Sequence, residues 1–356
     1  MTTLRRYTLI TPRLDRTGPC NVAVDIGRAA ALAGWHVTFL YLSGTDERGD
    51  VAAFADARRF RWSDILGAQG VIHTHCLRPD LLGWLFTWNS RCTVMTTLHN
   101  YFLIDLGFDH ATWKVRLAWE FWRRAIAAMS HRACISRAML RYYRRLLPRL
   151  EFELAYNFRQ DIVSHEPAEE RLGSWVASRK AAGQTCLVYV GSLSARKNLR
   201  PLFAALVSAP ELSLLICGQG PQQGELKVLA EELGLAARVL FAGQVRHPEG
   251  VLPLCDMLVL PSLAEGLPLA VVEALRAGLP CLLSNIAVHR ELAALGAGRT
   301  FDHHRFTNFR QQAAALSRED SPVTRQAAIA LWAKHFSASA GFAQYERILA
   351  GKTSGS

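Results

Sequence analysis

Residues 257–273, MLVLPSLAEGLPLAVVE, run from a fully apolar segment through a short turn into a helix-like segment. An apolar run of this length, bounded by turn residues, is typical of a buried strand in a parallel sheet. Gly266 permits a tight turn, and Pro268 suits the first turn of a helix. The backbone amides of Gly266, Leu267 and Leu269 would then form a helix N-terminus, which can bind a phosphate.

Two glutamates frame this turn. Glu265 precedes the turn and is placed to face a sugar, whereas Glu273 lies about one turn inside the helix. A carboxylate at Glu273 can accept two hydrogen bonds from a ribose diol while a diphosphate binds the helix amides. The alternative is an ordinary helix start at which acidic residues favour the helix dipole. The spacing alone leaves both interpretations open.

Similar apolar runs alternate with helical patterns along the chain, which predicts an α/β protein with parallel sheets covered on both faces. The alternation breaks between residues 158 and 185, where the sequence is polar, so we expect two successive Rossmann-like units. We place the first domain at residues 1–165, the second at 180–336 and a last helix at 339–350. The predicted strands are Tyr7–Thr11, His36–Leu42, Val71–Thr74, Thr93–Leu98, Ala133–Ile135, Glu153–Tyr156, Cys186–Val190, Leu212–Cys217, Val239–Ala242, Met257–Leu260, Pro280–Leu283 and Arg299–Phe301.

The turn after the predicted strand Cys186–Val190 carries two adjacent cations, Arg196 and Lys197. Gly191 lets the backbone come close to a ligand, and two cations at this place suit a diphosphate leaving group. A solvated basic turn is the alternative. The later turn Gly218–Pro221 lacks the G-x-G-x-x-G spacing and the downstream acid of a dinucleotide site, so we reject that interpretation.

Candidate site residues also follow strands in the first half of the chain. His99 would lie beyond the end of a strand, where open parallel sheets bind ligands. It would hydrogen-bond a sugar hydroxyl or polarise the reacting centre, and His75 has the same placement with weaker support. Gly18, after the first strand, would let the backbone approach the donor or the acceptor. A core histidine and a plain turn are the alternatives.

The composition fits a globular protein with two cores. The chain has 356 residues, of which 50% are hydrophobic and 20% are charged. We expect neither a signal peptide nor a membrane-spanning helix, because no apolar run is long enough. The eight cysteines form no CxxC pair and predict buried thiols in a reducing cytoplasm. We expect no metal and no other cofactor.

The net charge of +11 is concentrated in one window. Between Trp113 and Arg149, ten Lys or Arg residues stand against one acid, which gives +9. Basic residues and Trp on amphipathic helices are typical of binding to an anionic membrane surface. A solvated face over core helices and RNA binding are the alternatives. The residues assigned to a membrane surface are Trp113, Lys114, Arg116, Arg123, Arg124, Arg137, Arg141, Arg144 and Arg145.

Taken together, these motifs resemble the retaining GT-B glycosyltransferases of family four over nearly the whole chain. The most specific element is the E-x7-E pattern of Glu265 and Glu273. The segment from Gly191 to Lys197 looks like the diphosphate loop of that family, and His99 looks like its active-site histidine. Ser192 stands where the family usually has arginine, so Arg196 is expected to supply that charge instead.

The resemblance implies two Rossmann-like domains with parallel sheets facing across a cleft, and a last helix that packs back on the first domain. It implies metal-independent transfer with retained anomeric configuration, with His99, Glu265 and Lys197 as catalytic residues. Positive groups would stabilise the departing diphosphate. Val245 is expected to meet the base through its backbone. The implied donor-binding residues are Gly18, Gly191, Arg196, Lys197, Val245, Glu265, Gly266, Leu267, Leu269 and Glu273.

The implied partners are a nucleotide-diphosphate-sugar, a UDP-sugar above all, and a lipid-linked oligosaccharide or lipopolysaccharide-type acceptor. With the basic window, this predicts a cytoplasmic enzyme peripheral at the inner face of the cell membrane, with no nucleic-acid partner. Two alternatives are a nucleotide-sugar epimerase on the same fold and a non-catalytic membrane- or RNA-binding protein.

Overall fold

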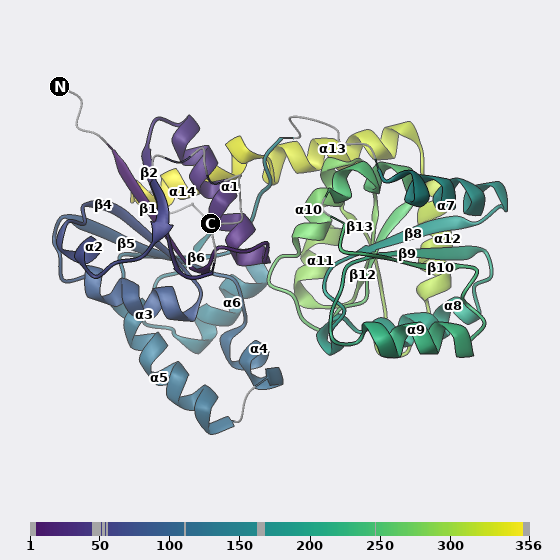
Figure 1. Cartoon of the computed structure of the whole chain (residues 1–356), viewed down its shortest axis with the longest axis horizontal. Helices are drawn as coiled ribbons and strands as arrows, with labels where there is room; N and C mark the ends of the chain where they lie inside the picture. The colour runs from purple at the N-terminus through teal and green to yellow at the C-terminus, as the bar shows by residue number, and fades with distance from the viewer. Residues whose placement is uncertain are drawn as a thin grey trace. The chain divides into compact units, whose positions relative to one another are not determined.

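Apolar strands build two parallel sheets, one in each of two units of the chain (Figure 1). The computed structural model describes residues 5–44, 51, 54, 56–109, 112–161, 168–245 and 247–351. The first unit holds residues 1–161 together with 335–356, and the second holds residues 162–334. The second unit therefore includes helix α7, Glu170–Ala181, most of which precedes residue 180, where we placed the start of the second domain. The last helix of the chain belongs to the first unit.

The first unit has a seven-stranded sheet in the order β3-β2-β1-β4-β5-β6-β7. All neighbouring strands run parallel, and the central strands β1, β2, β4 and β5 are buried over most of their length. The strands are β1 Arg6–Arg13, β2 His36–Ser43, β3 Asp56–Arg59, β4 Gly70–His75, β5 Cys92–Leu98, β6 His131–Cys134 and β7 Glu153–Leu154; the helices are α1 Gly18–Leu32, α2 Ser63–Leu66, α3 Leu77–Phe86, α4 Phe102–Asp109, α5 Thr112–Ala128, α6 Arg137–Leu146 and α14 Ala338–Leu349.

The second unit has a six-stranded parallel sheet in the order β10-β9-β8-β11-β12-β13. Helices α8 and α9 lie on one side of this sheet, and α7 and α13 lie on the other (Figure 1). The strands are β8 Thr185–Val190, β9 Leu212–Cys217, β10 Val239–Gly243, β11 Met257–Leu260, β12 Cys281–Ser284 and β13 Gly298–Phe301; the helices are α7 Glu170–Ala181, α8 Leu199–Val207, α9 Gln223–Glu232, α10 Leu269–Arg276, α11 Ala287–Ala294, α12 Phe309–Glu319 and α13 Pro322–His335, with short 3₁₀ turns η2 Ala195–Lys197, η3 Pro248–Gly250 and η4 Leu252–Leu254.

The sequence missed one strand, β3. Its four residues are Asp56, Ala57, Arg58 and Arg59, and none of them is fully buried. A polar strand at the edge of a sheet lacks the apolar pattern by which buried strands are found. The twelve predicted strands are confirmed with ends shifted by at most two residues, and most of them contain an apolar run.

Helix α14 is fixed to the first sheet by polar and packing contacts. The Tyr345 hydroxyl lies 3.2 Å from the hydroxyl of Thr97 on β5. Gly341 packs so tightly on the ring of Phe158 that a Cβ atom there would lie 2.1 Å from a ring carbon. These contacts give a physical reason why the last helix groups with the first unit.

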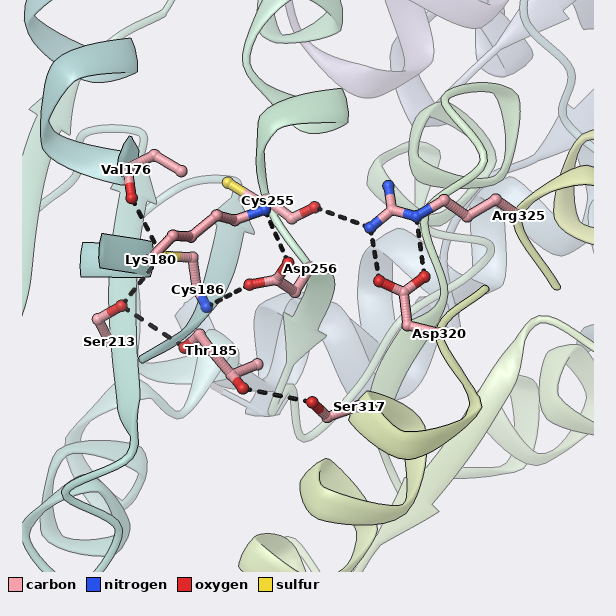
Figure 2. Close-up of polar contacts among 10 residues, drawn as sticks. All are labelled: Val176, Lys180, Thr185, Cys186, Ser213, Cys255, Asp256, Ser317, Asp320 and Arg325. Atoms are coloured by element: carbon pink, nitrogen blue, oxygen red, sulfur yellow. Dashed lines mark hydrogen bonds and ion pairs between the residues drawn. The ribbon is translucent and has the colours of Figure 1, made fainter. Parts of the chain in front are cut away.

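The amino-terminal edge of the second sheet is held by charge pairs (Figure 2). At the start of β11, Asp256 accepts a hydrogen bond from the backbone amide of Cys186 at 2.7 Å and lies 2.8 Å from Lys180 on α7. Arg325 on α13 pairs with Asp320 at 2.8 Å and donates to the carbonyl of Cys255. These contacts fasten α7 and α13 to the ends where the strands begin.

Candidate active site

The order of strands in the second sheet reverses between β8 and β11. Parallel open sheets bind ligands beyond the carboxyl ends of the strands at such a reversal, because the loops leave in opposite directions there. Lys197 ends the 3₁₀ turn that follows β8, and Glu265 lies in the turn that follows β11. The two residues singled out from the sequence therefore lie on either side of the reversal.

Backbone and side-chain hydrogen bonds tie these two turns together. The amide of Leu263 donates to the carbonyl of Arg196 at 2.9 Å, and the Arg196 guanidinium donates to the carbonyl of Ala264 at 3.0 Å. Asn198 has a left-handed backbone with φ 55°, and its side-chain amide donates to the carbonyl of Pro261 at 3.2 Å. The cations are thus held against the glutamate turn by several independent contacts.

Glu265 is the charged centre of the site. Its side chain is buried, and its Oε1 accepts from Lys197 Nζ at 2.5 Å and from Ser262 Oγ at 2.7 Å. Its Oε2 lies 3.7 Å from the Arg196 guanidinium. Burial opposes ionisation, but the charges of Lys197 and Arg196 outweigh it and lower the pKa of Glu265 to about 2. The carboxylate is therefore ionised at any ordinary pH.

A buried hydrogen-bonded chain lies behind Glu265. Ser284, the last residue of β12, donates from its hydroxyl to the carbonyl of Ser262 at 2.6 Å. Nδ1 of His289 on α11 lies 2.8 Å from the same Ser284 hydroxyl. Burial lowers the pKa of His289 to about 4, although the Glu265 carboxylate opposes that change, so the ring is neutral at pH 7.

The sequence did not identify Ser262, Ser284 or His289 as site residues. Ser262 and Ser284 stand at or just after the carboxyl ends of β11 and β12, so the rule on strand ends included their positions, whereas His289 lies on α11. Serines and a single histidine carry little signal on their own, because most such residues are simply satisfied by neighbouring groups.

Three glycines allow the loops after β8 and β9 to pack closely. A Cβ atom at Gly218 would lie 1.8 Å from the carbonyl oxygen of Gly191, and one at Gly220 would lie 2.5 Å from that of Leu193. Gly191 has φ 155°, and its amide donates to the carbonyl of Cys217. The turn Gly218–Pro221 therefore has a packing function: it supports the loop that leads to the cations.

The helix after the glutamate turn begins one residue later than expected. Pro268 precedes the helix as its cap, and α10 starts at Leu269. Leu267 is buried, and Glu273 on the helix is 9% exposed. Gly266 lies in the turn between Glu265 and α10. These positions keep the predicted order of turn, helix start and buried acid.

Val245, expected to meet the base, lies after β10 and is partly buried. Near it, the carbonyl of Gly243 accepts from the amide of Gly218 at 2.7 Å. Within the second unit, the predicted donor residues thus extend from the loop after β10 to helix α10.

His99 and His75 form a pair at the carboxyl edge of the first sheet. His75 ends β4, His99 follows β5, and His75 Nδ1 lies 2.8 Å from His99 Nε2. Burial lowers the pKa of both rings, and the neighbouring His73 adds to the effect on His75. Both imidazoles are neutral at pH 7, so His99 is suited to hydrogen bonding rather than to carrying a charge.

Gly18 opens helix α1, which follows the turn after β1. Its place is also a reversal point, because β1 and β4 are neighbours from which the strand order runs in opposite directions. A Cβ atom at Gly18 would meet no described atom within 4 Å. Packing within the described residues therefore does not require glycine there.

The basic window divides into structural and exposed residues. Trp122 is buried and donates to Asp80 at 2.7 Å, and Arg132 is buried against backbone carbonyls, so neither can face a membrane. Arg123 pairs with Glu120, and Arg144 donates to the carbonyl of Phe152. The exposed members of the predicted surface are Trp113, Lys114, Arg116 and Arg124 on α5 and Arg137, Arg141, Arg144 and Arg145 on α6.

Comparison with known proteins finds a family match in the second unit. Residues 176–322, which hold the Lys197–Glu265 pair, match the family model of the glycosyl transferases group 1. A relative among these transferases is the O-antigen biosynthesis glycosyltransferase WclY of Escherichia coli, 25% identical over 62% of this chain and 63% of its own length. This alignment thus spans less than two thirds of that relative.

Two further comparisons concern a galactosyltransferase and a solved structure. The chain is 37% identical to the Escherichia coli UDP-Gal:alpha-D-GlcNAc-diphosphoundecaprenol alpha-1,3-galactosyltransferase over 27% of both chains. The solved structure of HepE from Anabaena with UDP-glucose has a TM-score of 0.79 at 16% identity and covers 97% of this chain and 99% of its own. The chain therefore has the GT-B fold of two Rossmann-like domains.

Proposed function

We propose that the protein is a retaining, metal-independent glycosyltransferase that moves a sugar from a nucleotide-diphosphate-sugar to a membrane-associated glycan. The observation that carries the proposal is the buried Glu265 with Lys197 and Arg196 at the reversal point of the second sheet. Two cations beside a loop glycine suit a departing diphosphate, whose negative charge grows as the glycosidic bond breaks.

In this proposal, different residues of the second unit bind different parts of the donor. Lys197 and Arg196 face the diphosphate, Glu273 accepts from the ribose, and Glu265 accepts from hydroxyls of the transferred sugar through Oε2. The backbone around Val245 meets the base. A UDP-sugar is the first choice, because HepE was solved with UDP-glucose and the galactosyltransferase relative is named for a UDP-galactose donor.

In the first unit, His99 hydrogen-bonds the reacting sugar as a neutral donor. The tautomer of the His75–His99 pair supports this role. His75 Nε2 is buried without a hydrogen-bond partner among the described residues, and an unpaired acceptor is less costly there than an unpaired N–H. His75 therefore carries its proton on Nδ1 and donates to His99 Nε2. His99 then keeps its Nδ1 proton for a ligand.

The proposed acceptor is a lipid-linked or lipopolysaccharide-type glycan at the inner face of the membrane. The galactosyltransferase relative is named for a diphosphoundecaprenol acceptor, and WclY for O-antigen biosynthesis. Among the described residues, no helix is long and apolar enough to cross a bilayer. Membrane contact would therefore be made by a surface.

Helix α5 offers such a surface. Trp113, Leu117 and Phe121 are 65%, 54% and 50% exposed and stand four residues apart, so they line one side of the helix. Lys114 and Arg124 are exposed on the same helix. An apolar stripe beside cations is the pattern of a helix that lies on anionic lipid.

The donor assignment is tested by nucleotide binding and by transfer. We expect UDP, GDP or ADP to raise the melting temperature, and Glu273→Ala to abolish that rise while Glu232→Ala, exposed on α9, keeps it. Transfer to a lipid-linked acceptor should fall about 100-fold in Glu273→Ala, a loss of about 2–4 kcal/mol. A conversion of donor in the absence of acceptor would instead indicate an epimerase.

The membrane surface is tested by flotation with neutral and anionic vesicles. We expect binding to anionic vesicles only, and a loss of it in Trp113→Ser with Phe121→Ser. Trp88→Ser is the matched control, because Trp88 is 78% exposed outside the basic window. Equal flotation of all three proteins, or no preference for anionic lipid, would contradict this surface.

A further inference from the structure

The chain of hydrogen bonds behind Glu265 has one arrangement that satisfies its members. Ser284 has one hydroxyl proton, while both the Ser262 carbonyl and His289 Nδ1 lie within 2.8 Å of its oxygen. If the Ser284 proton went to His289, two oxygen atoms without a proton between them would face each other at 2.6 Å. The proton therefore goes to the Ser262 carbonyl, and Ser284 accepts from His289.

Two further observations agree with a proton on Nδ1 of His289. This nitrogen also lies 3.1 Å from the backbone carbonyl of Ser284, which can only accept. Nε2 of His289 is buried without a hydrogen-bond partner among the described residues. Burying an unpaired acceptor costs less free energy than burying an unpaired N–H, so the proton of His289 is on Nδ1.

The direction of these bonds leads from α11 to the carboxylate. His289 donates to Ser284, Ser284 donates to the carbonyl of Ser262, and the Ser262 hydroxyl donates to Oε1 of Glu265. The Ser262 backbone is thus fixed from one side while its side chain holds the glutamate from the other. With Lys197 also on Oε1, the carboxylate is held in one rotation.

We propose that His289 is a positioning residue for recognition of the transferred sugar: through Ser284 and Ser262 it fixes the Glu265 carboxylate so that Oε2 is presented to a sugar hydroxyl. This inference rests on the proposed function. It assigns the fixed orientation of Glu265 to a residue on the next strand–helix unit, three hydrogen bonds away from the Glu265 carboxylate.

The proposal makes a selective prediction. Positioning of Glu265 matters for the sugar, whereas the nucleoside diphosphate is bound by the other residues of the site. Loss of His289 should therefore weaken binding of a nucleotide-sugar and leave binding of its nucleoside diphosphate unchanged. A residue with a general structural role would lower both affinities together.

The test uses a matched pair of variants. His289→Leu keeps a branched side chain of similar shape near Cγ but has no hydrogen-bond donor. His289→Asn keeps a donor, because asparagine carries an amide nitrogen on Cγ where histidine carries Nδ1. Dissociation constants are measured for UDP, GDP and ADP, and for the glucose, galactose and N-acetylglucosamine esters of the nucleotide that the wild type binds.

We expect His289→Leu to raise the ratio of the nucleotide-sugar to the nucleotide dissociation constant at least tenfold, and His289→Asn to keep it within about threefold. Ser284→Ala removes the next member of the hydrogen-bond chain and should raise the same ratio at least tenfold. It therefore provides the test if His289→Leu does not fold. An unchanged ratio in His289→Leu or, where that variant does not fold, in Ser284→Ala overturns the inference. If the wild type binds no nucleotide at all, the proposed function itself fails.

Discussion

The two edges of the second sheet each hold a lysine paired with an acid, and the pairs differ in what their oxygens do. At the amino-terminal edge, Asp256 gives one oxygen to Lys180 at 2.8 Å and the other to a backbone amide at 2.7 Å (Figure 2). At the carboxyl edge, both short bonds of Glu265 go to Oε1, and Oε2 lies 3.7 Å from Arg196.

The same pair of residue types thus serves two purposes in this sheet. A carboxylate whose two oxygens both bond within the protein adds cohesion between elements. A carboxylate held firmly through one oxygen keeps acceptor capacity on the other, next to two cations. The first arrangement joins α7 to the sheet, and the second is the one we assign to donor binding.

The largest expected effect comes from removing the lysine at the carboxyl edge. We expect Lys197→Ala to lower the rate of sugar transfer about 100-fold or more, about 2–4 kcal/mol, because charge on the departing diphosphate loses its nearest cation. The matched change at the other edge, Lys180→Ala, should leave the rate of the folded enzyme within about twofold. Steady-state rates with a fixed donor and acceptor compare the two variants.

A control is needed because Lys197→Ala leaves the buried Glu265 carboxylate without its closest partner, which costs about 3–5 kcal/mol in such pairs. Lys197→Ala with Glu265→Gln removes that charge as well. This double variant should recover stability and stay inactive. Activity near wild type in a folded double variant would remove Lys197 and Glu265 from the donor site.

The converse change removes the acid at the amino-terminal edge. We expect Asp256→Asn to lower the free energy of unfolding by about 1–3 kcal/mol, since a charged acceptor loses a backbone donor and an ammonium partner. Transfer per folded molecule should be unchanged. Chemical denaturation and a rate normalised to folded protein measure both quantities; a specific loss of rate would place function at this edge too.

The sequence predicted those candidate residues that directly follow neighbouring strands. Lys197 and Glu265 were found because each follows an apolar strand, and the neighbouring positions of β8 and β11 then bring them together. The two α/β units with parallel sheets were predictable because the strands at the centre of each sheet hold apolar runs, whereas the GT-B fold was predicted from the family resemblance. The polar edge strand β3 escaped detection because it has no such run.

The hydrogen-bond chain behind Glu265 could not be predicted. It requires that the ends of β11 and β12 lie side by side and that α11 return a histidine five residues after Ser284. The basic window shows the opposite error. Both Trp113 and Trp122 lie inside the window, yet Trp113 is exposed and Trp122 is buried, because the helical face of each residue depends on what α5 packs against.

A smaller effect concerns pH and the buried histidine of the carboxyl edge. His289 has a pKa of about 4 in the folded protein and about 6.5 when unfolded, so the unfolded state binds an extra proton between these values. The neutral His289 ring therefore makes its full contribution to the free energy of unfolding above pH 6.5. This contribution is lost as pH falls toward 4, at about 1.4 kcal/mol per pH unit. His289→Asn should reduce the slope of stability against pH by that amount, as measured by chemical denaturation across this pH range. A slope equal to that of the wild type would show that His289 does not titrate in this way.

The smallest expected effect tests whether every charge pair at the amino-terminal edge contributes equally. Arg325 and Asp320 form a forked pair at 2.8 Å, but both side chains are partly exposed, at 28% and 23%, and lie five residues apart in the chain. Solvent-accessible pairs of this kind contribute about 0.2–1 kcal/mol, because water screens them and ordering both side chains opposes the gain. We expect Arg325→Met to lower the free energy of unfolding by less than about 1 kcal/mol, well below the loss in Asp256→Asn, with unchanged transfer.

Since Arg325 also donates to the carbonyl of Cys255, Asp320→Asn is the variant that isolates the pair. A loss in Asp320→Asn as large as that in Asp256→Asn would mean that cohesion at this edge comes from the whole charged network, and that Asp256 is not its centre.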